Sequence, residues 1–242
     1  MANKNKVMVF LSMCFGGLLV LPFIASCGKN DGGVTPSNSR ITMQVVNLSP
    51  DLQPINLWVG YEKQNSYSFS YPTPSGYFSL TNIDTPIQIR SYKTTISTGN
   101  FIVRKDILKP NFRYTLFVTG LRNDTSAANK VTSIFTVDTA NNPTPGRGKI
   151  RFVNASPKSS AFDITANGTL AFAGVAYRAV TPFKEVPPGT YEFKIMPAGS
   201  TTVISTFKEV IVQDGKVYTL FCRGVAGGAD SVAFGAGIIS NR

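Results

Sequence analysis

An internal repeat constrains the fold of this sequence more than any other feature. Segment 43–50 (MQVVNLSP) lines up with segment 150–157 (IRFVNASP) at an offset of 107 residues. Segment 107–118 (ILKPNFRYTLFV) lines up with segment 211–222 (IVQDGKVYTLFC) at an offset of 104 residues. Because the offset changes so little along the repeat, we interpret the two halves of the chain as copies of one domain.

Each copy has the pattern of short β-strands separated by turns. Ile150 and Phe152 alternate with Arg151 and Val153, which is the period of a strand with one buried face. The Asn-Gly pair at 167–168 is a strong signal for a two-residue hairpin turn. About seven such strands at spacings of roughly 8–12 residues are typical of a β-sandwich. The sequence therefore predicts an all-β fold with two tandem immunoglobulin-like or transthyretin-like β-sandwich domains.

The domain boundaries follow from the composition of the connecting segments. We expect the first sandwich at 41–138, a Gly/Pro-rich linker at 139–148 and the second sandwich at 149–242. Within the repeat, segment 87–90 (IQIR) lines up with segment 191–194 (YEFK), also at an offset of 104 residues.

The N-terminal segment has the anatomy of an export signal. Lys4 and Lys6 precede an apolar run at 7–24, and small residues follow immediately before Cys27. The cysteine at the cut site resembles the lipobox of bacterial lipoproteins. An uncleaved membrane helix is the alternative, but two glycines and a proline interrupt the apolar run. We therefore predict a lipoprotein signal peptide at 1–26, lipid attachment at Cys27 and a flexible tether at 27–40.

Composition and charge exclude several classes of function. The chain has no histidine, so Ser-His-Asp nucleophile systems and histidine-based zinc sites are absent. After removal of Cys14 with the signal and lipidation of Cys27, Cys222 is the one thiol left, and its apolar surroundings predict a buried, inert group. The net charge of +11 is spread along the chain without a basic stripe, which argues against nucleic acid as a partner. We expect no catalytic residue, no metal and no cofactor.

Two repeated elements point to a structural role. Tyr114 and Tyr218 each follow a turn and open an apolar strand, as in the tyrosine corner, where the phenol bonds back to the backbone. Burial of these rings for packing alone is the alternative. An Asn-x-Ser-Pro element at 47–50 and 154–157 is expected to cap the end of a strand.

An aromatic segment of the first copy is the candidate ligand-binding site. Its candidate residues, which crowd into about twenty positions, are Trp58, Tyr61, Tyr67, Tyr71 and Tyr77. Aromatic rings on a polar loop can stack on sugar rings or pack on a protein partner. The alternative, which is the commoner case, is that the alternating residues Tyr67, Phe69 and Tyr71 face the core of one strand.

The second copy also resembles a known family. Its segments 152–157 (FVNASP), 186–191 (VPPGTY), 197–202 (PAGSTT) and 215–220 (GKVYTL) are similar to the bacterial envelope domain called domain of unknown function 4397. The first copy keeps fewer of these motifs. The resemblance implies tandem β-sandwich modules on a secreted or surface-anchored chain, and it implies no activity.

These observations lead to one functional hypothesis and two alternatives. We expect a non-enzymatic lipoprotein of the cell envelope that is held to a membrane by its N-terminal lipid and binds an envelope glycan or protein. Gly28 is not the aspartate that retains many lipoproteins in the inner membrane, so the resemblance to lipoproteins implies the outer membrane, on either its periplasmic or its surface face. The first alternative is a structural or adhesion subunit of the envelope, and the second is a carboxylate-based hydrolase.

Overall fold

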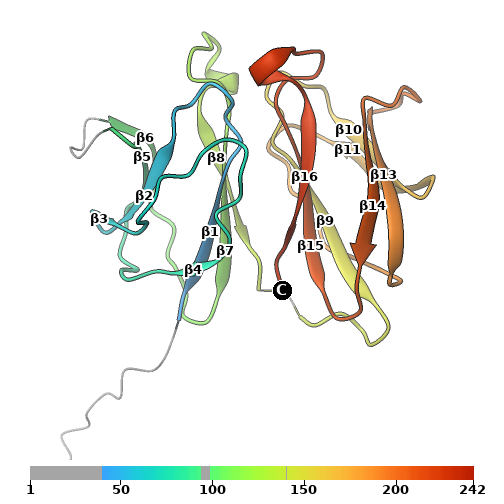
Figure 1. The fold of residues 1–242 in the computed structure, drawn as a ribbon, viewed down its shortest axis with the longest axis horizontal. Coiled ribbons are helices and arrows are strands. Elements are labelled where there is room, and N and C mark those ends of the chain that lie inside the picture. Colours follow the sequence, from blue (N-terminus) through green and yellow to red (C-terminus); the bar gives the residue numbers. More distant parts are fainter. Residues whose placement is uncertain (1–39, 94–98, 140) are drawn as a thin grey trace, which may run out of the picture. The chain divides into compact units, whose positions relative to one another are not determined.

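The computed structural model describes residues 40–93, 99–139 and 141–242, and within them the first copy of the repeat forms a β-sandwich (Figure 1). Its strands are β1 (Thr42–Asn47), β2 (Ile55–Val59), β3 (Glu62–Lys63), β4 (Phe78–Ser79), β5 (Ile87–Ser91), β6 (Asn100–Arg104), β7 (Arg113–Thr119) and β8 (Thr132–Val137), with a 3₁₀ turn η3 (Ala127–Asn129) before the last. One sheet has the order β4-β1-β7-β8 and the other has the order β3-β2-β5-β6.

The second copy repeats this topology strand for strand. Its elements are β9 (Gly148–Asn154), β10 (Phe162–Ala166), β11 (Thr169–Val175), β12 (Lys184–Val186), β13 (Gly189–Pro197), β14 (Ser205–Val212), β15 (Val217–Arg223), η4 (Asp230–Val232) and β16 (Gly235–Ser240). The sheets are β12-β9-β15-β16 and β11-β10-β13-β14. The predicted all-β fold with two sandwich domains is confirmed.

The strand order distinguishes the two kinds of sandwich that the sequence allowed. In an immunoglobulin constant domain the first two strands belong to the same sheet. Here β1 and β2 belong to different sheets, and β1 runs parallel to β7, as β9 does to β15. The transthyretin-like description is therefore the one that fits both copies.

Strand register corrects one part of the sequence alignment. Val59 pairs with Ile87 in the first copy, and the corresponding Ala166 pairs with Phe193 in the second. Ile87 is therefore equivalent to Phe193, and the alignment of Ile87 with Tyr191 was wrong by two residues. A shift of two residues keeps every side chain on its own face of the sheet, so the apolar pattern could not reveal it.

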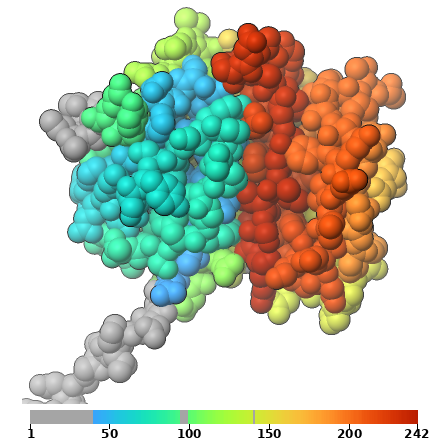
Figure 2. Space-filling model, viewed as in Figure 1, coloured from blue at the N-terminus to red at the C-terminus, as the bar shows by residue number. Residues whose placement is uncertain are grey.

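The strands where the two sandwiches meet are buried on both faces. This differs from the single buried face that the sequence predicted for 150–154. On β7, Leu116 lies in the core of the first sandwich, whereas Phe117 lies in a separate apolar cluster shared with the second copy. In that cluster the rings of Phe117 and Phe221 lie 5.9 Å apart. Figure 2 shows atoms of the C-terminal segment directly against those of the first copy. We call this shared layer the seam.

The predicted tyrosine corner is present in both copies. The phenol oxygen of Tyr114 accepts a hydrogen bond from the backbone N–H of Lys109 at 2.8 Å, and that of Tyr218 accepts one from the N–H of Gln213 at 3.3 Å. Each tyrosine thus bonds five residues back along the chain and fixes the turn before its strand, as the sequence predicted.

The Asn-x-Ser-Pro element also has the expected structural role. The side-chain oxygen of Asn154 accepts a hydrogen bond from the N–H of Ser156, whose hydroxyl donates to the carbonyl of Gly224. Asn47, Ser49 and Gly120 form the same pair of bonds in the first copy. The element therefore ties the end of the first strand to the end of the seventh in each sandwich.

The predicted export signal, the predicted lipidation site and the predicted tether up to residue 39 lie outside the described residues. Among the residues that are described, no helix has the length and apolar character needed to cross a membrane.

Candidate functional site

Three of the five candidate aromatic residues follow one edge of the first sandwich. Trp58 lies on β2, Tyr61 lies in the β2–β3 turn, and Tyr67 lies in the segment that runs back along β2. A hydrogen bond holds this segment against β2: the N–H of Leu57 donates to the side-chain oxygen of Asn65 at 2.8 Å. Tyr61 is 64% exposed and Tyr67 is 69% exposed. We call Trp58, Tyr61 and Tyr67 the aromatic edge.

The backbone at Tyr61 is unusual for a bulky residue. Gly60 and Tyr61 have φ angles of 55° and 69°, so both residues of this turn are left-handed. The equivalent turn of the second copy consists of Asn167 and Gly168, the preferred residues for such a hairpin turn. A side chain in the left-handed region costs roughly 1–2 kcal/mol. The first copy therefore carries a strained, exposed tyrosine where its sister has a glycine.

Trp58 has a different role from the two tyrosines. The guanidinium of Arg90 lies 4.2 Å from the centre of its ring, and Arg90 itself is only 4% exposed. A guanidinium nitrogen of Arg90 donates to the side-chain oxygen of Gln88 at 2.5 Å. Trp58 is therefore half-buried and engaged by Arg90, whereas Tyr61 and Tyr67 are exposed to solvent.

The structure places Tyr71 and Tyr77 at the seam, apart from the aromatic edge. The guanidinium of Arg223, from the second copy, donates to the phenol oxygen of Tyr71 at 2.6 Å and lies 5.2 Å from the centre of its ring. The phenol of Tyr77 donates to the carboxylate of Asp138 at 2.7 Å. Burial and the negative charge of Asp138 both raise the pKa of Tyr77, so this phenol stays protonated. The five candidate residues thus belong to two separate places.

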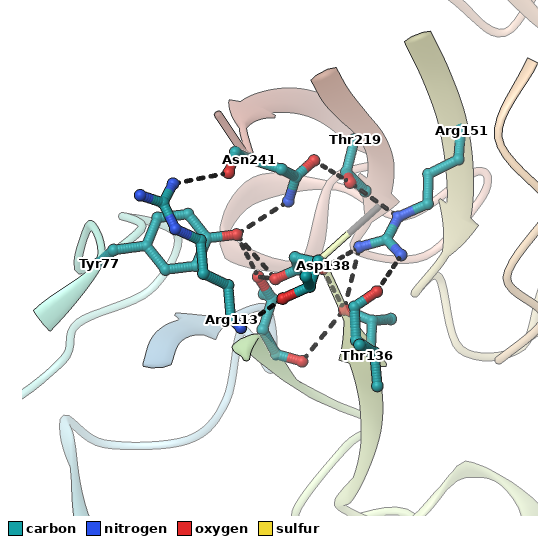
Figure 3. A network of polar contacts seen from close by, with 10 residues as sticks. Tyr77, Arg113, Thr136, Asp138, Arg151, Thr219 and Asn241 are labelled. Atoms are coloured by element: carbon teal, nitrogen blue, oxygen red, sulfur yellow. Dashed lines mark hydrogen bonds and ion pairs between the residues drawn. The ribbon is translucent and has the colours of Figure 1, made fainter. Parts of the chain in front are cut away.

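Asp138 is the centre of the polar network at the seam (Figure 3). Its carboxylate accepts hydrogen bonds from Thr115 at 2.5 Å, from Thr136 at 2.9 Å and from Tyr77. It also forms an ion pair with Arg151 of the second copy, in which the two side chains are 0% and 5% exposed. Because every oxygen of this buried carboxylate is satisfied, the network joins the two sandwiches through a specific geometry.

The second copy contributes equivalent residues to the network. The hydroxyl of Thr219 donates to the side-chain oxygen of Asn241 at 2.6 Å, as that of Thr115 does to Asp138, and Asn241 donates to Tyr77 at 2.9 Å. Arg151 corresponds in the repeat to Gln44 of the first copy. Sequence analysis did not single out this network. Its one signal was an arginine between apolar residues on a strand that proved to be buried on both faces.

A small polar cavity opens beside the network, with a volume of about 260 Å³. It is lined by Asn111, Arg113, Asp138, Thr139, Val217, Asn241 and Arg242. Arg113 is already engaged, since it donates to the carbonyl of Asn241 at 3.0 Å and lies over the ring of Tyr77. The cavity is smaller than the roughly 300 Å³ at which ligand pockets begin, so it suits ordered water better than a ligand.

The described residues offer little for nucleophilic or metal chemistry. Cys222 is fully buried, and burial raises the pKa of its thiol to about 12, so the reactive thiolate is not formed at neutral pH. Within the described ranges, no three His, Cys, Asp or Glu side chains gather as metal ligands would.

Comparison with known proteins agrees with the repeat. No curated protein matches the chain. The family described as a domain of unknown function (DUF4397) matches twice, over residues 42–165 and over residues 148–235. The first match covers the first sandwich and runs into the second as far as β10, and the second match lies within the second sandwich, so the two overlap at 148–165. The chain therefore belongs to the DUF4397 family, with two consecutive copies of the domain.

Proposed function

We propose that this chain is a lipid-anchored protein of the bacterial cell envelope that binds a glycan through its aromatic edge and catalyses no reaction. The observation that carries the proposal is Tyr61. A tyrosine that is strained and 64% exposed, at a turn position where the sister domain has glycine, has no visible use in the fold. Strained residues that persist in this way tend to cluster at functional sites.

The surroundings of the edge favour a sugar as the ligand. Tyr67 lies in a polar segment, between Ser66 and Ser68, and is 69% exposed. Tyrosine combines an apolar face with a polar tip, which suits the apolar face and the hydroxyl rim of a sugar ring. The second copy has Thr165 in place of Trp58 and Gly168 in place of Tyr61, so only the first copy is equipped in this way.

Replacing Tyr61 with glycine separates binding from stability. Tyr61→Gly is expected to raise the free energy of unfolding by about 1 kcal/mol, because glycine adopts the left-handed turn without strain. The same change should weaken glycan binding at least about tenfold, because it removes an exposed ring of the kind that dominates binding surfaces. Urea denaturation measures the first effect, and glycan arrays followed by titration with the best ligand measure the second.

Arg178→Gly is the matched control, because Arg178 is also exposed and left-handed, with a φ of 67°, but belongs to the second copy. It should gain similar stability and keep the binding of the wild type. Equal glycan binding by wild type and Tyr61→Gly would refute the role of the edge. If no glycan binds and a protein cross-links at Tyr61 in intact cells, the ligand is a protein instead.

Lipidation is tested independently of binding. Mass spectrometry of protein from the membrane fraction should find a mature N-terminus at Cys27 carrying a diacylglycerol group, with residues 1–26 removed. Cys27→Ala should leave the signal uncleaved. A wild-type peptide in which Ser26 is still joined to an unmodified Cys27 would contradict the anchor. If Cys27 is lipidated, the tether at 27–40 spans at most about 50 Å in fully extended form, which follows from roughly 3.3–3.6 Å per residue.

A further inference from the structure

An apolar cavity of about 380 Å³ opens in the second sandwich, near the β10–β11 turn and the start of β13. Its lining includes Ile150, Ala166, Ala171, Lys184, Glu185 and Val186. Its volume lies within the range of roughly 300–1,000 Å³ that small-molecule sites occupy in proteins, and such sites are mostly apolar with a few polar groups. The cavity is made by the second copy alone and is separate from the aromatic edge.

The first copy fills the same space with a phenylalanine. Phe78 pairs with Met43, and Lys184 pairs with Ile150, which is the equivalent of Met43 in the repeat. Phe78 and Lys184 are therefore equivalent positions. Phe78 packs against the core of the first sandwich and stacks on Phe69, with 5.9 Å between ring centres. The long side chain of Lys184 instead lies exposed at the rim of the cavity.

Two further positions are smaller in the second copy. Ala166 on β10 is the equivalent of Val59 on β2, since each pairs with the first residue after its hairpin turn. Val186 follows Lys184 by two residues, as Leu80 follows Phe78, and Leu80 also packs against its core. The first copy therefore places bulkier apolar side chains at three positions that line the hollow in the second copy.

The lining of the cavity holds one basic residue, Lys184, and one acidic residue, Glu185. The ammonium of Lys184 donates to the carbonyl of Ala171 and lies 5.3 Å from the ring of Phe172, but no carboxylate of the described residues pairs with it. The neighbouring Glu185 is occupied, because it accepts from the N–H of Thr144 at 3.1 Å and lies 3.5 Å from the ammonium of Lys149. A ligand with a negative head would therefore be favoured here.

We propose that this cavity binds the hydrocarbon chain of an anionic amphiphile of the fatty-acid class, with the carboxylate held by Lys184. The apolar walls would cover the chain, and burial of each methylene group is worth about 0.8 kcal/mol in transfer from water. The ammonium already lies at the rim, 5.3 Å from the centre of the Phe172 ring, and it can turn from the carbonyl of Ala171 toward a carboxylate.

The test is calorimetric titration of decanoate into the full chain, with methyl NMR to locate the binding. Wild type is expected to bind one decanoate, with shifts confined to the alanine methyls at 166 and 171 and their neighbours. Lys184→Phe restores the residue that fills the first copy, and Ala171→Leu fills the cavity from the other side. Both variants should lose decanoate binding. Ile211→Phe, an exposed change elsewhere in the second copy, should leave it unaltered.

A second arm tests the charge. Lys184→Gln should weaken decanoate several-fold and leave decan-1-ol unchanged, and Lys184→Arg should restore decanoate. Circular dichroism checks that each variant keeps its strand spectrum; if Ala171→Leu does not fold, Lys184→Phe and Lys184→Gln decide the matter. Absence of decanoate binding by wild type, or equal binding by wild type and Lys184→Phe, would overturn the proposal, as would shifts centred on Trp58 or Tyr61.

Discussion

Replacing Asp138 with alanine is expected to lower the free energy of unfolding by about 3–5 kcal/mol. The carboxylate of Asp138 is fully buried and pairs with Arg151, which is also buried. Without Asp138 the guanidinium of Arg151 keeps the cost of its lost hydration and loses its partner, and breaking a buried pair in this way is strongly destabilising. Three further donors, Tyr77, Thr115 and Thr136, would lose their acceptor as well.

The equivalent residues in the other copy suggest a double substitution that restores the lost free energy of unfolding. Gln44 and Asn241 are neutral residues that occupy the places equivalent to Arg151 and Asp138 in the other copy. The double variant Asp138→Asn with Arg151→Gln should therefore recover most of the stability lost by either change alone, because it leaves no buried charge. Urea unfolding of the wild type, both single variants and the double variant gives the coupling energy as a double-mutant cycle.

The control is the exposed ion pair between Arg104 and Asp106. Its atoms approach to 2.7 Å, but its side chains are 27% and 32% exposed. Asp106→Ala should cost no more than about 1 kcal/mol, since solvent and salt screen such pairs. If Asp138→Ala costs as little as Asp106→Ala, then Asp138 is hydrated in solution and the seam is open there.

The repeat and the local motifs could be predicted from the sequence because they depend on short stretches of chain. Tyr114 and Tyr218 could be assigned a bond to the backbone because the partner lies five residues away. The Asn-x-Ser-Pro element occurs in two copies with different neighbours, and this indicated a requirement of the fold. Turn residues such as Gly168 predicted where the hairpins lie. All of these signals are local in sequence.

The seam could not be predicted because its contacts join distant parts of the chain. Tyr71 and Tyr77 looked like members of the aromatic surface, but their partners Arg223 and Asn241 lie more than 150 residues away. An alternating strand such as 150–154 predicts which residues share a face. It does not predict whether the second face meets water or another sheet. Of the aromatic segment, Phe69 does face the core as the alternative expected, whereas Tyr67 is exposed.

Replacing Phe117 with alanine should show whether the two sandwiches unfold as one body. Phe117 is fully buried in the seam, against Phe221 and other apolar residues of the second copy. Its truncation should cost about 3–5 kcal/mol, the usual range for a buried phenylalanine. The loss falls on the seam and spares both sandwich cores, because Phe117 belongs to neither.

The shape of the unfolding transition carries the sharper test. Wild type should unfold in one cooperative transition, seen alike by the fluorescence of Trp58 in the first copy and by circular dichroism of both. Phe117→Ala should split it, so that the fluorescence and circular-dichroism midpoints no longer coincide. Ile107→Ala, at a side chain that is 81% exposed, should change neither midpoint. A loss below about 1 kcal/mol in Phe117→Ala would mean that its ring is already hydrated, because a buried phenylalanine cannot be truncated so cheaply. The two copies would then behave as independent domains, and the network around Asp138 could not hold them together.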